Sequence, residues 1–215
     1  MRHAYAAAAI ALTLPAVACG PKTPDYQSIW STTPTTTTTT TRVAKPVPLS
    51  QYLQNIGVTG EQVAPSNLPD LAVSIPTPAG WSVASNPHIS PKTLMISKGG
   101  KYPTARLVVF LLHGDFDAAQ VIQHGNDDAQ LFEDFKQLDA STTPYNGFPS
   151  SMIQGSYDLD GTRLHSFNRI VIATGSPPAK QRYLVQLTIT GLANEAVAQS
   201  TDIEAIMRGF VVAAK

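Results

Sequence analysis

The sequence contains very little cysteine and few charged residues. Its 215 residues include a single cysteine, Cys19, which excludes an intramolecular disulfide and the thiolate zinc sites that need several cysteines. Charged residues make up 14% of the chain, below the roughly 25% of ordinary globular domains. The 15 basic and 15 acidic side chains cancel, so no net positive field favours nucleic acid. These deficits exclude a disulfide scaffold and argue against a nucleic-acid-binding protein.

The sequence motifs of the common enzyme classes are also missing. There is no Gly-x-Ser-x-Gly nucleophile turn and no His-Glu-x-x-His zinc helix. Neither of the glycine-rich phosphate-binding patterns, Gly-x-x-x-x-Gly-Lys and Gly-x-Gly-x-x-Gly, occurs. The sequence therefore predicts a noncatalytic protein with no catalytic residue, no cofactor and no metal ion.

Residues 1–18 have the three-part layout of an export signal. A basic start at Arg2 precedes an apolar run that ends at Ala18 and falls short of the about 20 residues of a bilayer-spanning helix. Small residues before Cys19 and a glycine after it are similar to the lipobox of bacterial lipoproteins, although Ala16 stands where a leucine is usual. We therefore expect a removed signal peptide, and Cys19 as the acylated first residue of the mature protein. The alternative is an ordinary secretory signal with a chance cysteine at its end.

Residues 19–48 have the composition of a disordered tether. Threonine fills the uninterrupted run from Thr35 to Thr41, and prolines close the segment. Such a sequence buries too little apolar surface to offset the entropy of ordering. Two or three acyl chains on Cys19, at about 0.8 kcal/mol per buried methylene, would anchor it stably. We expect this tether to hold a soluble globular body, residues 49–215, at the outer face of the plasma membrane; its threonines fit both an O-glycosylated stalk and an unmodified spacer.

The body begins with alternating helix and strand patterns. A short helix is predicted over Leu49 to Asn55, ended by Gly57. Leu71, Val73 and Ile75 alternate with other residues as in a half-buried strand. The six apolar residues from Leu107 to Leu112 predict a strand that is covered on both faces and lies in the middle of the sheet.

The second half of the body adds a helix, a hairpin, a strand and a last helix. Apolar positions over 117–136 recur at helical spacing, with Gly125 as a point where the helix splits or bends. Asp160-Gly161 predicts a two-residue turn between strands 153–159 and 162–172, pairing Tyr157 with Leu164 and Asp158 with Arg163.

A strand follows over 183–189, and Asn194 is expected to cap a last helix that carries Phe210 on its inner face. Sequential antiparallel strands with helices before and after them predict the α+β class. The expected architecture is one antiparallel sheet with helices packed on it.

Two groups of acidic and histidine residues resemble metal ligands. His113, Asp115 and Asp117 follow the predicted central strand, and His124 lies further along. An aspartate there is also a good helix cap, which leaves the histidines solvated, and we favour that interpretation.

The second metal-like group comprises Asp158, Asp160 and His165. Pairing with Arg163 and a place in the turn account for its two carboxylates without a metal.

Long segments of the chain resemble the mycobacterial LpqN/LpqT lipoprotein family, and its LpqT members most closely. The likeness lies in the Ala-Val-Ala-Cys-Gly-Pro-Lys start, the threonine stalk, and segments 73–81, 148–157 and 180–187. The resemblance implies an exported, acylated envelope lipoprotein whose body has a PsbP-like α/β/α sandwich fold. It implies no established catalytic residue, so only Cys19 carries over.

Three functions fit these observations. We favour a noncatalytic module that binds an envelope lipid or scaffolds a protein partner, because anchor, tether and body suffice for that role. An apolar groove between helix and sheet would support it. The alternatives are a cell-wall-modifying enzyme, with His113 and Asp115 as its least poor candidate site, and a surface lipoprotein that engages a host receptor through its acylated terminus.

Overall fold

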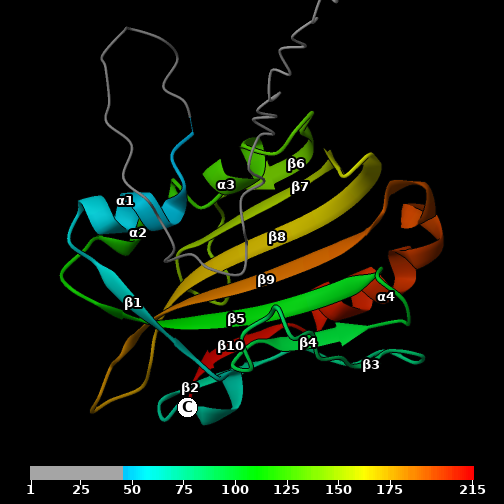
Figure 1. The fold of residues 1–215 in the computed structure, drawn as a ribbon. Helices are drawn as coiled ribbons and strands as arrows, with labels where there is room; N and C mark the ends of the chain where they lie inside the picture. The colour runs from blue at the N-terminus through cyan, green and yellow to red at the C-terminus, as the bar shows by residue number, and fades with distance from the viewer. Residues whose placement is uncertain (1–45) are drawn as a thin grey trace, which may run out of the picture.

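An antiparallel sheet of eight strands runs through the computed structural model, which describes residues 46–215 (Figure 1). Its strands are β1 (Thr59–Val63), β3 (Ser82–Val83), β4 (Leu94–Ser97), β5 (Thr104–His113), β6 (Lys136–Ser141), β7 (Ser150–Leu159), β8 (Thr162–Thr174) and β9 (Arg182–Leu192). They lie in the order β3-β4-β5-β9-β8-β7-β6. One edge of β5 pairs first with β4 and then, further along, with β1.

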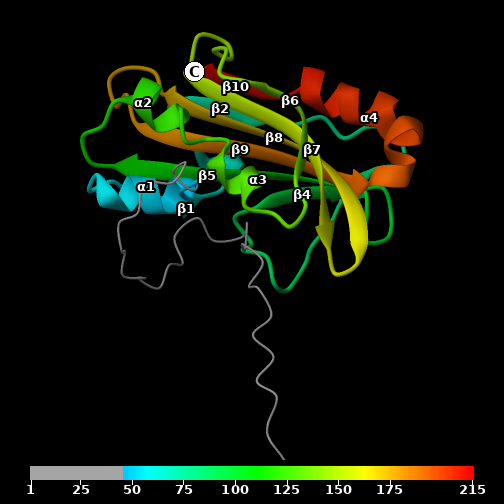
Figure 2. The ribbon, with the colours of Figure 1, turned by 90° about the horizontal axis from the view of Figure 1, so that it is seen from above.

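Two layers cover the faces of this sheet. A two-stranded sheet of β2 (Leu71–Ser74) and β10 (Val211–Ala214) lies with α4 (Ala196–Arg208) on one face. The short helices α1 (Leu49–Asn55) and α2 (Ala118–Ile122) pack on the other. Figure 2 shows α1 and α4 on opposite sides of the sheet. The α+β class with helices packed on an antiparallel sheet is therefore confirmed.

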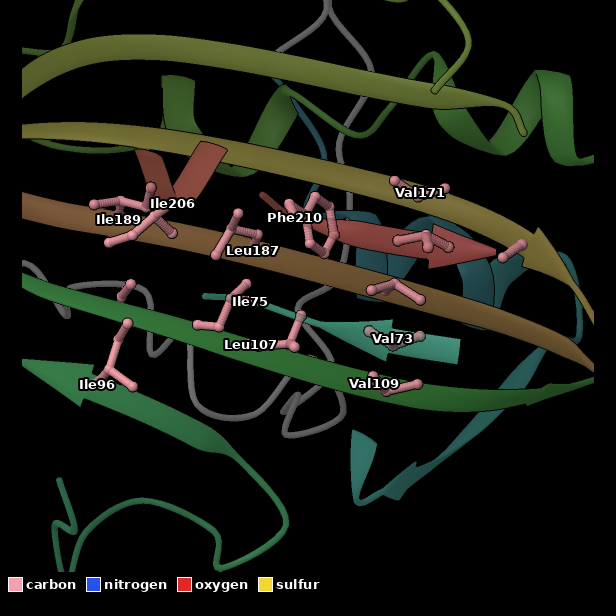
Figure 3. Close-up of a cluster of buried hydrophobic side chains, with 14 of the residues drawn as sticks. Val73, Ile75, Ile96, Leu107, Val109, Val171, Leu187, Ile189, Ile206 and Phe210 are labelled. Atoms are coloured by element: carbon pink, nitrogen blue, oxygen red, sulfur yellow. The ribbon is translucent and has the colours of Figure 1, made fainter. Parts of the chain in front are cut away.

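The two faces have separate hydrophobic cores. Figure 3 shows the larger one, in which side chains of β5 and β9 meet those of β2, α4 and the segment after it. Val109 belongs to this core, and the next residue, Phe110, belongs to the core beneath α1 and α2. Alternate side chains of β5 thus point into different cores, which confirms a strand covered on both faces. The middle strand is β9, however, and β5 lies beside it.

The predicted hairpin is present with its predicted register. Tyr157 pairs with Leu164 and Asp158 with Arg163. Asp160 and the following glycine have φ angles of 50° and 72°, as a two-residue turn with two left-handed residues requires. The first helix, α1, also has the predicted bounds.

The helix predicted over 117–136 is wrong in its length, whereas the split expected at Gly125 is confirmed. The chain instead forms α2, then α3 (Asp127–Gln130), and residues from Lys136 onward form β6, an edge strand that the sequence pattern did not reveal. The break falls at Gly125, where a Cβ atom would overlap the side chain of Ser151 on β7. The chain passes very close to β7 at Gly125, and the helix is interrupted there.

The carboxyl end differs from the prediction as well. The last helix ends at Arg208, and Phe210 packs into the core from beyond it. Asn194 is not a cap, because a 3₁₀ turn of residues Ala193–Glu195 precedes α4. The final residues form β10, which pairs with β2 in a second sheet that the sequence did not predict.

A buried carboxylate ties β2 to the end of the β8–β9 hairpin. Asp70 is 5% exposed, and its side chain accepts hydrogen bonds from the Tyr183 hydroxyl at 2.6 Å and the Gln181 backbone N–H at 2.9 Å. Gly175 lies so close to this carboxylate that a Cβ atom there would overlap it. These hydrogen bonds of Asp70 position the two-stranded sheet over the main sheet.

We predict that Val109→Asp unfolds the body. Val109 is 0% exposed, so an unpaired carboxylate there should lower the free energy of unfolding by about 4 kcal/mol or more. Urea unfolding followed by circular dichroism measures this. Val197→Asp on α4, where the valine is 89% exposed, is the matched control and should change stability little; a Val109→Asp protein as stable as this control would refute the packing described.

Candidate functional site

The sheet face that carries α1 and α2 is apolar at one end and polar at the other. Phe110, Ile170 and Leu184 lie in the core under the two helices. Further along β9 the same face presents Gln186, Thr188 and Thr190, because side chains two residues apart share a face. The helices end before this polar region.

A hydrogen-bonded polar band begins there. Asn168 and Gln186 are each 4% exposed, and the Asn168 Oδ1 atom accepts hydrogen bonds from Gln186 Nε2 and Thr188 Oγ1, both at 2.9 Å. Since these buried polar groups satisfy one another, the band is stable within the sheet. Beyond it the face opens into two hollows.

The first hollow, which we call the sheet hollow, has a volume of about 250 Å³. Its floor and walls come mainly from β5, β7 and β9 and include Tyr102, Thr104, Arg106, Tyr157, Leu159 and Thr190. Thr104 and Arg106 face it because the alternate residue, Ala105, points into the opposite core.

The second, the loop hollow, has a volume of about 610 Å³ and lies against the loop between β3 and β4. Its apolar lining consists of Val83, Ala84, Pro87, Ile89, Pro91 and Met95. Asn86, Ile89 and Met95 line both hollows, so the two adjoin. Together the two hollows form one recess, the groove, which has a mainly apolar part (the loop hollow) and a polar part (the sheet hollow).

The loop that forms the groove wall is tied to β1. Lys92 Nζ donates a 2.7 Å hydrogen bond to the backbone oxygen of Gln62 and lies 3.6 Å from Glu61. The Gln62 amide nitrogen in turn donates to Thr93 Oγ1 at 3.0 Å. Backbone hydrogen bonds within the loop add further constraint. These contacts constrain the loop against β1, and constraint of this kind lowers the entropy lost on binding.

Tyr157 is the most perturbed titratable group of the groove. Burial, and then the adjacent Tyr102, raises the pKa of Tyr157 to about 12, although Arg106 and a side-chain hydrogen bond with Thr190 lower it. The hydroxyl therefore stays protonated at neutral pH and remains available for hydrogen bonding. Phe132 stacks on the Tyr157 ring with 4.0 Å between centroids, which fixes its orientation.

The first predicted metal-like group lies elsewhere. His113 ends β5, seven residues after Arg106, and at about 3.3 Å per residue this places it roughly 23 Å from the groove. Asp117 caps α2, accepting from the Ala119 N–H at 2.7 Å, which confirms the expected cap. His113 is exposed as expected, whereas His124 is only partly exposed. His124 contacts Asp127 at 3.0 Å and stacks on Tyr52.

The second group also has the structural roles expected of it. Asp158 forms an ion pair with Arg163 at 3.1 Å, and Asp160 occupies the turn. The His165 ring lies 2.9 Å from the Gln154 side-chain nitrogen. Within residues 46–215, no cluster of three metal-ligating side chains occurs. Cys19, the one proposed site residue, lies outside the described residues.

Sequence reasoning missed the groove residues. The predicted strand began at Leu107, although extending its alternation backward would have placed Arg106 and Thr104 on one face. Tyr157 lies in a predicted strand, but no local pattern shows that its side chain and that of Met95 converge. The loop wall carries no motif at all.

Fold and groove define the body as an α+β sandwich with one partly covered sheet face. A family model described as "Probable lipoprotein LpqN" matches residues 45–213. The chain therefore belongs to this lipoprotein family, which confirms the resemblance. Among helices of the described chain, none is long and apolar enough to cross a bilayer.

Individual relatives agree. The LpqT lipoprotein of Mycobacterium leprae is 72% identical over 210 residues, covering 98% of this chain and 95% of the relative. The LpqT lipoprotein of Mycobacterium tuberculosis H37Rv is 64% identical over 212 residues, covering 99% and 94%. A crystal structure of LpqN, a protein involved in cell envelope biogenesis of Mycobacterium tuberculosis, matches with a TM-score of 0.65 at 19% identity, covering 76% of this chain and 95% of that one. This last match shows the shared fold.

The carboxyl group of Asp128 in α3, which contacts the first residue of α1, should make stability depend on pH. Asp128 Oδ2 accepts a 3.0 Å hydrogen bond from the Leu49 N–H. Burial raises the pKa of Asp128 from 3.8 to about 6; the Leu49 bond opposes this rise and Asp127 adds to it. The folded state thus holds this proton more tightly than the unfolded chain does, so its stabilising contribution is full below pH 3.8 and is lost as the pH rises through about 6.

We predict that Asp128→Asn removes this pH dependence. The asparagine has no proton to lose. As the pH rises from about 4 to about 7, the free energy of unfolding of wild type should therefore fall by about 2 kcal/mol relative to that of the variant. Urea unfolding at several pH values measures the difference. Asp139→Asn, at an exposed residue of β6, is the control; a difference for Asp128→Asn that stays constant with pH would contradict the prediction.

Proposed function

We propose that this chain is a noncatalytic lipid-binding protein of the cell envelope. In this proposal residues 1–18 are a removed signal, acylated Cys19 anchors the protein at the outer face of the plasma membrane, and residues 19–48 tether the body. The body, residues 49–215, holds an amphiphile in the groove. The family's lipoprotein character and the involvement of LpqN in cell envelope biogenesis support the setting.

The observation that carries the proposal is the two-part lining of the groove. The loop hollow of about 610 Å³ is within the range of about 300 to 1,000 Å³ usual for small-molecule sites. Its apolar lining suits an acyl chain, whereas the sheet hollow offers hydroxyl groups and a guanidinium. A molecule with an apolar tail and a polar head matches both parts at once.

We predict that Ile89→Asp weakens amphiphile binding about tenfold or more, since Ile89 lines both hollows and burying such a side chain against an acyl chain contributes about 1.5–3 kcal/mol. The protein is the full chain with Cys19→Ala, which removes the acylation site. Binding is measured as displacement of the uncharged fluorophore N-phenyl-1-naphthylamine by dodecyl maltoside below its micelle threshold.

Two variants away from the groove are the controls. His113→Ala and Val197→Asp should bind as the parent does, because neither residue lies near the lining. Complete loss of binding in His113→Ala would instead favour the end of β5 as the site. Absence of amphiphile binding by the parent protein would refute the proposal.

We predict that Cys19→Ala releases the protein from the membrane fraction. Without the thiol no acyl chain can be attached, and multiple acyl chains are what stable anchoring requires. Detergent phase partitioning and incorporation of labelled palmitate are the measurements, with the exposed-site variant Val197→Asp as control. Unchanged partitioning of Cys19→Ala would refute the anchor.

A further inference from the structure

The groove contains positive charge without negative charge. Arg106 lines the sheet hollow, and Lys101 stands at the same hollow with its ammonium 5.5 Å from the centre of the Tyr102 ring. Neither hollow has an aspartate or glutamate in its lining. A cationic, partly apolar recess of this kind attracts anionic ligands.

Arg106 differs from the other arginines of residues 46–215. Arg163 pairs with Asp158, and Arg208 pairs with Glu204. Arg169 donates to a serine hydroxyl, and Arg182 donates to a backbone oxygen while lying on a phenylalanine ring.

Within that part of the chain, the Arg106 guanidinium has no hydrogen bond or ion pair with a protein acceptor, and its electrostatic neighbour is Tyr157. It is nevertheless half-buried on the strand. Its guanidinium nitrogens are not among the buried polar atoms without a partner, so solvent reaches them and its N–H donors are available to the acceptor atoms of a ligand. The neighbouring hydroxyls of Thr104, Tyr157 and Thr190 point to a site for oxygen-rich groups.

We propose, resting on the lipid-binding function above, that the groove selects an anionic lipid whose phosphate group binds Arg106. The planar guanidinium matches two phosphate oxygens. The hydroxyls of the sheet hollow then complete the site for the phosphate, and the acyl chain extends along the apolar loop hollow past Ile89 and Met95. Arg106 thereby determines head-group specificity, while the loop hollow supplies affinity for the tail.

The test compares two amphiphiles with the same tail on the full Cys19→Ala chain. We expect dodecyl phosphate to displace N-phenyl-1-naphthylamine at an affinity about tenfold or more above that of dodecyl maltoside, since hydrogen bonds to charged groups are the stronger ones. This preference should weaken with added salt. Inorganic phosphate alone should not displace the probe, because it lacks the tail.

Arg106→Gln should weaken dodecyl phosphate binding about tenfold or more and dodecyl maltoside binding by much less, so that the preference for the phosphate head group is lost. Arg106→Lys should retain part of the preference. Arg208→Gln on α4, remote from the groove, is the matched control, and thermal unfolding verifies that each variant is folded.

The outcomes separate the two proposals. Equal affinity of the parent for both amphiphiles, or equal loss of both in Arg106→Gln, overturns phosphate selection while leaving lipid binding in place. Displacement by inorganic phosphate alone would mean that the site binds a free anion and not a lipid. Failure of both amphiphiles to bind the parent overturns the lipid-binding function itself.

Discussion

The structure depends on covering both faces of one twisted sheet with few helices. Strands β5 and β9 alternate between two cores, so both of their faces need a covering layer. On one face α4 and the β2–β10 pair provide it, secured by the buried carboxylate of Asp70. On the other face the cover consists of the short helices α1 and α2, with α3 and the segment after it beside β7. They cover one end, and the sheet residues change from apolar to polar where the helices stop.

The groove is a consequence of that incomplete cover. A polar band of Asn168, Gln186 and Thr188 is satisfied internally, and beyond it the side chains face an open recess bounded by the β3–β4 loop. Lys92 and Gln62 hold that loop in place. In this recess Arg106 is the one arginine of the described chain whose guanidinium has no protein acceptor.

Family membership and groove geometry address different questions. The match over residues 45–213 and the closely similar LpqT proteins establish a lipoprotein family. The structure adds a specific recess, the groove, whose lining is apolar in one part and carries hydroxyl groups and a guanidinium in the other. Anchor and groove are complementary in the proposed function, because a tethered body with an amphiphile site meets its ligand at the membrane surface. The residues that line the groove lie on β3, β4, β5, β7 and β9, in the loop between β3 and β4, and in the segment between β4 and β5.

Local sequence determined the elements whose signals are short-range. The Asp160-Gly161 turn fixed its hairpin register, the apolar run fixed β5, and Asp117 fixed the start of α2. The prediction of an export signal that ends before Cys19 likewise rests on sequence alone. Tertiary contacts decided the rest: Gly125 breaks a helical pattern because it meets Ser151, and β10 exists because β2 offers it an edge. The groove belongs to this second group, since Met95, Arg106, Tyr157 and Thr190 converge only through strand pairing between distant segments, which no local pattern encodes.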